Sequence, residues 1–61
     1  MKGFIEVEQI ETGKTLIAIK YVCCVEREGA ITWIYINNLA PVKTKETYEE
    51  IKQKIKEAQE Q

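Results

Sequence analysis

The sequence predicts an α+β domain in which a small antiparallel β-meander of four to five short strands is followed by one C-terminal helix. Two observations lead to this fold. Up to residue 46 the chain largely alternates apolar and polar side chains with the period of two that is typical of strands, and glycines or asparagines interrupt it at hairpin spacing. From residue 47 onward the apolar side chains recur with helical spacing. The 61 residues have room for one domain, residues 1–61.

The first two strands are predicted to form a hairpin. Residues 4–8 alternate, so that Ile5 and Val7 face the core while the two glutamates of this stretch face solvent. Gly13 can adopt the positive φ of a tight turn, and β-branched residues resume at Thr15. The first strand is therefore expected to have one solvated face.

The apolar stretch of residues 15–26 is too long for one short strand. We therefore expect a bend or bulge near Lys20 and Tyr21 that divides it. Its second half holds two adjacent cysteines, Cys23 and Cys24, which an extended backbone directs to opposite faces. We expect one to be a small buried hydrophobe and the other a half-exposed thiol, with a redox or metal role across a symmetric oligomer as the alternative.

Residues 30–36 have the strongest strand character in the chain. Both faces of this strand are largely apolar: one carries Ile31, Trp33 and Tyr35, and the other carries Thr32, Ile34 and Ile36. A single helix covers only one face of a small sheet. The other face is therefore expected to meet another subunit.

The segment before the helix combines a turn with a short strand. Asn37 and Asn38 suit a tight turn, because asparagine tolerates the left-handed backbone conformation. Residues 39–43 are the last predicted strand, and Pro41 confines it to a sheet edge or to a strand start. The domain thus has four strands, or five if the stretch 15–26 is divided.

The C-terminal helix has a defined start. Thr47 and Glu50 fit a capping box, in which each side chain bonds the backbone N–H of the other residue. One apolar stripe follows, formed by Tyr48, Ile51, Ile55 and Ala58. We expect Glu50 to pair with Lys54, one helical turn further on, and residues 59–61 to fray.

Composition argues against an enzyme. The chain contains no His, no Asp and no Ser, which removes an imidazole-activated nucleophile and any zinc site built on His. Two adjacent cysteines do not make a tetrahedral metal site alone, so neither a metal nor a cofactor is expected. Thiols without disulfide spacing favour a reducing compartment. With no apolar run of membrane-spanning length and no signal segment recognised, we expect a cytoplasmic protein without membrane contact, in the host cytoplasm if it is phage-encoded.

The chain is short for an independently stable domain. Apolar burial on folding contributes on the order of 90 kcal/mol, and ordering the residues costs about the same. Chains of this size usually gain stability from disulfides, a metal or a partner subunit. We therefore expect a homo-oligomer, a dimer or larger. The net charge of −1 gives no long-range attraction for phosphate backbones, so nucleic acid is a disfavoured partner.

Several of these segments resemble the small FlbD-like bacterial proteins, which include the swarming-motility SwrD group and uncharacterised bacterial and phage relatives. The matching positions are residues 4–7, 13–14, 16–19, 22, 25–26, 31–32, 42–43 and 46–51. The chain departs from the FlbD-like pattern at Asn37 and Asn38, where a glycine is usual, and in the aromatic character of Trp33 and Tyr35. The resemblance implies a fold, carries over no catalytic residue and includes a motility role as one hypothesis.

The candidate binding residues offer a flat apolar face, a fixed positive charge or a turn amide: Trp33, Tyr35, Arg27, Lys20 and Asn37. Two aromatic side chains on one strand face can stack on a ring or base, and the Arg27 guanidinium can bind phosphate bidentately. Lys20 lies near the expected bend. A domain this small has no room for a closed cavity, so a ligand pocket is expected between subunits.

Three function classes remain open. We expect a non-catalytic, homo-oligomeric binding or adaptor protein, FlbD-like and regulatory in role, that docks a host or cellular protein. The first alternative is a phage-encoded protein that binds and sequesters a nucleotide-like signalling molecule or otherwise blocks a host defence. The second is a weak nucleic-acid binder. Plain packing of Trp33 and Tyr35 in a core or interface is the competing interpretation of the aromatic pair.

Overall fold

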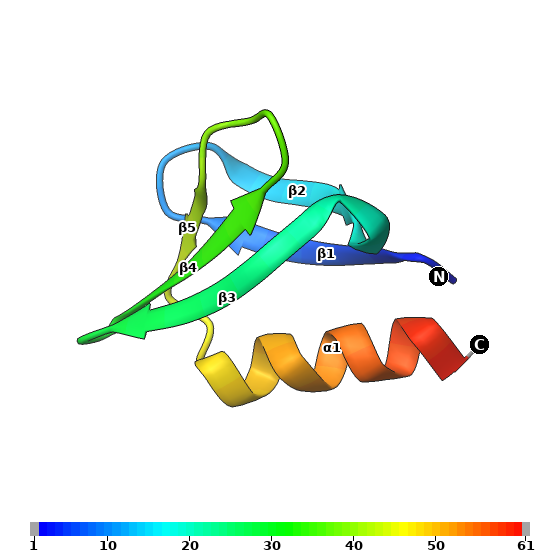
Figure 1. Ribbon diagram of the computed structural model, residues 1–61. Helices are drawn as coiled ribbons and strands as arrows, with labels where there is room; N and C mark the ends of the chain where they lie inside the picture. Colours follow the sequence, from blue (N-terminus) through cyan, green and yellow to red (C-terminus); the bar gives the residue numbers. More distant parts are fainter. Residues whose placement is uncertain (1, 61) are drawn as a thin grey trace.

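Within residues 2–60, which the computed structural model describes, five antiparallel strands form one sheet and one helix packs against it (Figure 1). The elements in chain order are β1 (Phe4–Gln9), β2 (Gly13–Ala18), the 3-10 turn η1 (Ile19–Tyr21), β3 (Val22–Glu28), β4 (Ile31–Ile36), β5 (Val42–Thr44) and α1 (Tyr48–Glu60). The predicted α+β fold, with short strands followed by one C-terminal helix, is confirmed.

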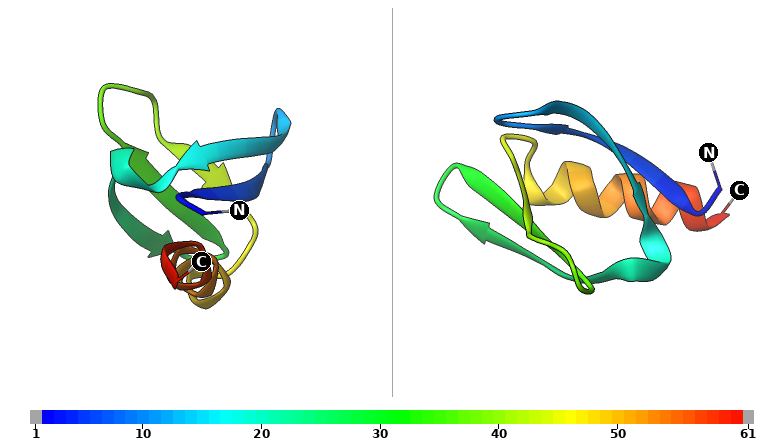
Figure 2. Two further views of the ribbon diagram at one scale, coloured as in Figure 1. Left: turned by 90° about the vertical axis from the view of Figure 1, so that its right-hand side faces the viewer. Right: turned by 90° about the horizontal axis from the view of Figure 1, so that it is seen from above.

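The strands lie in the order β2-β1-β5-β4-β3, so the last strand is inserted between the first and the fourth. β1 meets β5 at the pair Gln9 and Thr44, while all of β5 pairs with β4. The two edge strands, β2 and β3, follow each other in the chain and are joined by η1. A sheet whose two edges are connected at one corner has to curl, and Figure 2 shows β2 and β3 meeting at that corner.

The predicted turns and the predicted bend are present. Gly13 has a φ of 86° at the start of β2, and Asn38 has a φ of 64° in the turn after β4. Both lie in the left-handed region that glycine and asparagine tolerate best. η1 occupies the position of the expected bend near Lys20 and Tyr21. The long apolar stretch is therefore divided into two strands.

The last strand begins later than predicted. It spans Val42–Thr44 instead of residues 39–43. The backbone N–H of Leu39 donates to the Ile36 carbonyl at 3.2 Å, which holds the intervening residues in a turn. Pairing with β4 therefore starts only after Pro41, whose ring offers no N–H to a ladder.

The core lies between the sheet and α1. Its buried side chains alternate along β1 and β4 as the period of two requires, and they come from both ends of the chain: Ile5, Val7, Ile17, Ile34, Val42, Ile51 and Ala58. Ile51 is fully buried, and Ile55 packs against this cluster while partly exposed. The predicted apolar stripe of the helix is therefore confirmed at its centre, whereas Tyr48 at its start is 36% exposed.

The predicted capping box is present at the start of α1. The Glu50 N–H donates to the Thr47 hydroxyl at 3.0 Å, and the Thr47 N–H donates to the Glu50 carboxylate at 2.8 Å. This contact draws the Glu50 carboxylate back to the first turn. The expected pairing of Glu50 with Lys54 is wrong, because the Lys54 ammonium pairs with Glu46 instead.

The helix extends further than predicted. α1 is helical to Glu60, so the expected fraying of residues 59 and 60 is wrong, and Gln61 lies outside the described residues. The helix has 13 residues, of which many are charged. Among residues 2–60 there is no helix with the length and apolar composition that crossing a membrane requires.

Both cysteines are exposed, which corrects the expectation that one is buried. The register between β3 and β4 shifts between Val22 and Cys24, so Cys23 is the extra residue of a bulge. A bulge breaks the alternation of faces on which the expectation was based. Cys24 consequently lies opposite Tyr35, on the solvent side of the sheet.

Candidate functional site

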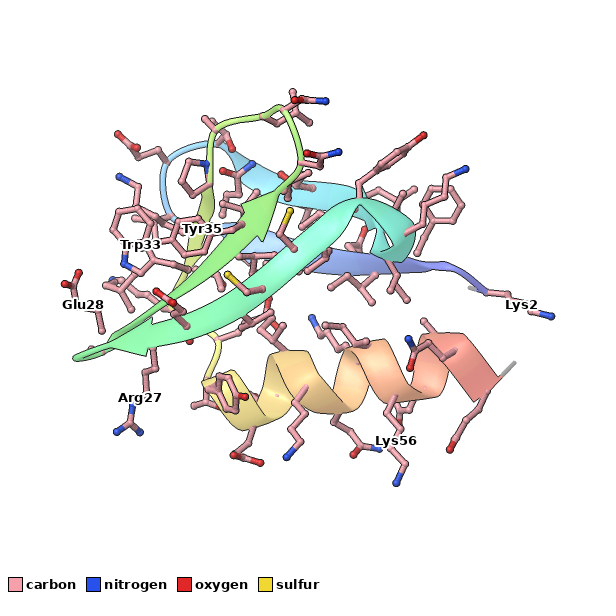
Figure 3. The ribbon with its side chains drawn as sticks, in the orientation of Figure 1. Lys2, Arg27, Glu28, Trp33, Tyr35 and Lys56 are labelled. Atoms are coloured by element: carbon pink, nitrogen blue, oxygen red, sulfur yellow. The ribbon has the colours of Figure 1, made fainter. Side chains whose placement is uncertain are left out.

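The strongest candidate for a binding surface is the sheet face that α1 does not cover, called here the outer face. In β4, Thr32 and Ile34 are buried on the helix side, at 1% and 0% exposure. Because side chains alternate along a strand, Trp33 and Tyr35 project to the outer face. Figure 3 shows both labelled side chains on the side of β4 away from α1. The predicted division of this strand into two faces is confirmed.

The two aromatic rings of the outer face are held nearly parallel. The ring centroids of Trp33 and Tyr35 are 6.2 Å apart, and the angle between the ring planes is 16°. Both side chains are half-buried, so part of each ring stays in contact with solvent. Such an offset aromatic pair is rigid and polarisable, and it suits contact with another ring or an apolar side chain.

Charged side chains flank this aromatic pair on the neighbouring strands. In register, Trp33 lies between Glu26 of β3 and Lys43 of β5. The Lys43 ammonium is 5.4 Å from the centroid of the Trp33 ring, which is cation–π range. It also lies 3.9 Å from the Glu11 carboxylate. The outer face is therefore an aromatic pair in a charged surround, and it lacks the continuous apolar character that the sequence of β4 suggested.

Lys43 supplies the positive charge that the sequence interpretation placed on Arg27. In register, Arg27 lies opposite Thr32, which faces the core side. Figure 3 shows its guanidinium extending on the helix side of β3, away from Trp33. There it lines a shallow hollow of about 370 Å³ with Thr47, Tyr48 and Glu49. Within one chain, Arg27 and the aromatic pair are on different faces, so their joint use requires a second subunit.

Lys20 and Asn37 each contact Tyr21, at the corner formed by η1. The Lys20 ammonium is 5.2 Å from the centroid of the Tyr21 ring. The Asn37 N–H donates to the Tyr21 carbonyl at 2.8 Å. Both candidate residues thus gather around Tyr21 and not around Trp33. Of the five predicted site residues, Trp33 and Tyr35 contact each other on the outer face, whereas Lys20 and Asn37 lie at the η1 corner and Arg27 lies on the helix side of β3.

A second polar cluster, called here the Glu46 junction, connects β5 to α1. The Glu46 N–H donates to the Thr44 hydroxyl at 3.1 Å, and the Thr32 hydroxyl donates to the Glu46 carbonyl at 2.7 Å. The Glu46 carboxylate accepts from the Glu8 N–H at 2.9 Å and pairs with the Lys54 ammonium. Backbone and side chain of Glu46 are therefore both engaged within the protein.

The same junction completes the hydrogen bonding of β1. β1 pairs with β5 only at Gln9, so the earlier residues on that side of β1 need other partners. The Lys54 ammonium donates to the Glu6 carbonyl at 2.7 Å, and the Glu46 carboxylate accepts from Glu8. Two side chains thus replace a neighbouring strand along this part of β1. No local sequence pattern indicates this arrangement, because it joins residues that are far apart in the chain.

The ionisation of Glu46 fits a structural role. Its partial burial favours the neutral form, but hydrogen bonds from Lys54 and from the Glu8 N–H, with the Lys54 charge, outweigh burial and lower the pKa of Glu46 below its usual value. The carboxylate is therefore ionised at neutral pH with its oxygens occupied. A group in this state is poorly suited to general acid or base catalysis.

An apolar groove of about 390 Å³ lies between β2 and the loop that connects β4 to β5. Its rim carries three of the most exposed large apolar side chains of the described chain: Leu16 at 52%, Tyr21 at 51% and Leu39 at 70% exposure. Its lining includes the four consecutive residues 15–18 of β2, which is an edge strand of the sheet. It is called here the seam groove.

No family model matches the chain, and neither the curated proteins nor the solved structures include a match to it. The resemblance to the FlbD-like proteins therefore stays a prediction that rests on the residues quoted above. Among residues 2–60, no three or more His, Cys, Asp or Glu side chains are grouped in a way that could hold a metal ion.

Proposed function

We propose that this protein is a non-catalytic, homo-oligomeric binding or adaptor protein whose outer face is the binding surface. The observation that carries the proposal is the nearly parallel pair of Trp33 and Tyr35, half-exposed on the face opposite α1 and flanked by the Lys43 ammonium. Aromatic side chains with one cation beside them are characteristic of sites that contribute strongly to binding.

The residues available for chemistry support binding in preference to catalysis. The chain has no imidazole and no serine hydroxyl, so a nucleophile would lack its usual activating base. The carboxyl group with a lowered pKa, Glu46, is engaged in the junction between β5 and α1. The exposed thiols of Cys23 and Cys24 support residence in a reducing compartment such as the cytoplasm. We include in the proposal a regulatory role through a host or cellular protein.

One observation favours a second candidate function, the sequestration of a nucleotide-like signalling molecule by a phage-encoded protein. Lys43 places a cation beside the Trp33 ring, so a π-surface and a positive charge lie within 5.4 Å. A nucleotide needs both, one for the base and one for the phosphate. In an oligomer, Arg27 or Lys20 of a neighbouring subunit adds further charge. Weak binding of nucleic acid is the third possibility, and the net charge of −1 disfavours it.

Calorimetry and light scattering with matched variants test the proposal. The titrants are a panel of nucleotides and cyclic dinucleotides and a single-stranded oligonucleotide at low and high salt. Trp33→Ala is expected to abolish any binding while leaving assembly intact, whereas Tyr21→Ala, which removes another exposed aromatic ring, is expected to leave binding unchanged. Arg27→Glu tests whether a neighbouring subunit contributes charge.

The results separate the candidates. Nucleotide binding lost in Trp33→Ala supports sequestration, and binding that weakens steeply with salt supports the nucleic-acid alternative. An oligomer that binds none of these probes supports the adaptor function. If Trp33→Ala dissociates the oligomer and Arg27→Glu changes neither assembly nor binding, the aromatic pair is structural and the outer face is not the binding surface.

A further inference from the structure

The two edges of the sheet are built differently. β2 and β3 each have only one neighbouring strand, so both present unpaired backbone groups. Natural sheets protect such edges with charges, bulges or a covering element, because an unprotected edge pairs with another chain. The residues of β2 and β3 show which of these edges is protected.

β3 carries two protective devices. Its ladder with β4 is broken by the bulge at Cys23, which distorts the edge near its start. Its second half is the charged run Glu26, Arg27 and Glu28. If two copies of β3 paired antiparallel about a two-fold axis at Glu26 or Arg27, like charges would lie opposite each other, which destabilises a sheet. The bulge and the charged run therefore make the β3 edge less suited to pairing with itself than a regular, apolar edge.

β2 has neither device. Its six residues pair with β1 without a register shift, and Lys14 is its single charge. The outward-facing Leu16 at its centre is 52% exposed, beside the seam groove. An edge strand of this kind, regular and apolar at its centre, is a template for strand addition.

The direction of the unpaired backbone groups of β2 follows from one hydrogen bond at the end of this strand. The Ile19 N–H donates to the Gly3 carbonyl at 2.9 Å, in continuation of the ladder between β1 and β2. Bonded and non-bonded pairs alternate in an antiparallel ladder, so the odd-numbered residues of β2 bond to β1. The backbone groups of Lys14 and Leu16 and the N–H of Ala18 therefore point to the free edge.

We propose that two copies of the chain associate through β2, antiparallel about a two-fold axis at Leu16. This register places Leu16 against the partner's Leu16 and Lys14 against the partner's Ala18, so apolar meets apolar and no like charges are opposed. It also matches the free backbone groups: each Leu16 N–H donates to the carbonyl of the partner's Leu16, and each Ala18 N–H to the carbonyl of the partner's Lys14. β2 is thus complementary to itself in both side chains and backbone.

This pairing rests on the proposed homo-oligomer and specifies its interface. It joins two five-stranded sheets into one continuous sheet through a strand that is separated from β4 by β1 and β5. The outer-face pair of Trp33 and Tyr35 is therefore left free, once in each subunit. The seam groove, which Leu16 helps to line, lies next to the joint.

Cysteine cross-linking tests the register. In a background of Cys23→Ser and Cys24→Ser, Leu16→Cys places two thiols on the two-fold axis, where opposed Cα atoms of a bonded pair are about 5.5 Å apart, within disulfide range. The matched control is Lys14→Cys on the same edge, whose two copies lie roughly 13 Å apart along the strands. Under mild oxidation, Leu16→Cys is expected to give a covalent dimer and Lys14→Cys to stay uncross-linked. Equal cross-linking of both variants, or of neither, overturns the register.

Light scattering across a concentration series tests the interface without a new thiol. Leu16→Lys adds a second charge to the edge and is expected to raise the dimer dissociation constant at least about tenfold. Ile10→Lys, an equally large change at a 42% exposed apolar residue outside β2, is expected to leave it unchanged. A wild-type oligomer that persists in Leu16→Lys overturns the β2 interface but leaves the homo-oligomer in place. A wild-type monomer at all concentrations overturns both.

Discussion

The Glu46 junction and the outer face both contain a glutamate and a lysine, but the side chains of the two regions differ in what they contact. At the junction, two buried threonines, a carboxylate and an ammonium bond one another and the edge of β1. On the outer face, Trp33 and Tyr35 stay half-exposed, and the charges of Glu26 and Lys43 reach solvent. The first region uses its polar groups to hold the helix to the sheet. The second leaves its groups exposed to solvent, so the proposed binding surface and the contacts that hold the helix lie on opposite faces.

The largest expected effect comes from breaking the junction at its buried end. Thr32→Val keeps the shape of the side chain but removes the hydroxyl that donates to the Glu46 carbonyl at 2.7 Å. Thr32 is 1% exposed, so the loss is expected to lower the free energy of unfolding by about 1–3 kcal/mol. Urea denaturation measures it, with Thr12→Val in the exposed first turn as the control. Equal effects of the two variants would show that the Thr32 hydroxyl bond does not stabilise the fold.

A smaller effect is expected at the more exposed end of the junction. Lys54→Met removes the ammonium that pairs with Glu46 and donates to the Glu6 carbonyl at 2.7 Å. Because the Lys54 side chain is 37% exposed, solvent screening limits the expected loss to about 1 kcal/mol. The matched change Lys52→Met, two residues earlier on the exposed side of α1, is expected to leave stability unchanged. A larger loss in Lys52→Met would contradict the placement of the ion pair.

The pH dependence of unfolding tests how much the Glu46 carboxylate contributes to the stability of the junction. The pKa of Glu46 is lower in the folded protein than its ordinary value of 4.5. The unfolded chain therefore binds the proton more tightly, so the contribution of Glu46 to stability is complete above pH 4.5 and is lost as the pH falls through the lower, folded pKa. Unfolding measured between neutral and acidic pH is expected to show a shallower acid loss in Glu46→Gln than in wild type. Parallel pH profiles of the two proteins would mean that the carboxylate is not stabilised by folding.

The smallest effects are expected at the two thiols. Cys23 and Cys24 are both exposed and lie at a bulge, so Cys23→Ser and Cys24→Ser are each expected to change the free energy of unfolding by less than about 0.5 kcal/mol. Binding by the outer face is also expected to survive both changes. Two results would contradict this expectation. One is a clear loss of stability in either variant, and the other is zinc that the wild type retains and either variant releases.

The sequence predicted the features that depend on neighbouring residues. The alternation in β4, the turn at Gly13, the bend at η1 and the capping box at Thr47 are all local, and all are present. The position of β5 between β1 and β4 could not be predicted in this way, because it depends on pairing between distant segments. The wrong predictions about the site come either from this long-range strand pairing or from the bulge in the pairing of β3 with β4.

Lys43 illustrates the effect of the long-range pairing, and Cys24 illustrates the effect of the bulge. Lys43 is a site residue only because β5 sets it opposite Trp33, and no local pattern fixes that register. For the cysteines, the alternation of faces was applied across the bulge at Cys23, where an extra residue invalidates it. The Glu46–Lys54 pair was missed for the first reason, since it forms only after the helix packs beside β1.

The most direct test of the division between the two faces uses Trp33, the one tryptophan of the chain, as its own reporter. Trp33 emission is recorded while wild type, Tyr35→Ala and Glu46→Gln are titrated with the nucleotide panel. A partner on the outer face is expected to shift the emission of wild type and of Glu46→Gln with the same midpoint, although Glu46→Gln unfolds more easily. Tyr35→Ala is expected to keep most of its stability and lose the response. A response that survives in Tyr35→Ala and disappears in folded Glu46→Gln would place binding at the junction and contradict the account.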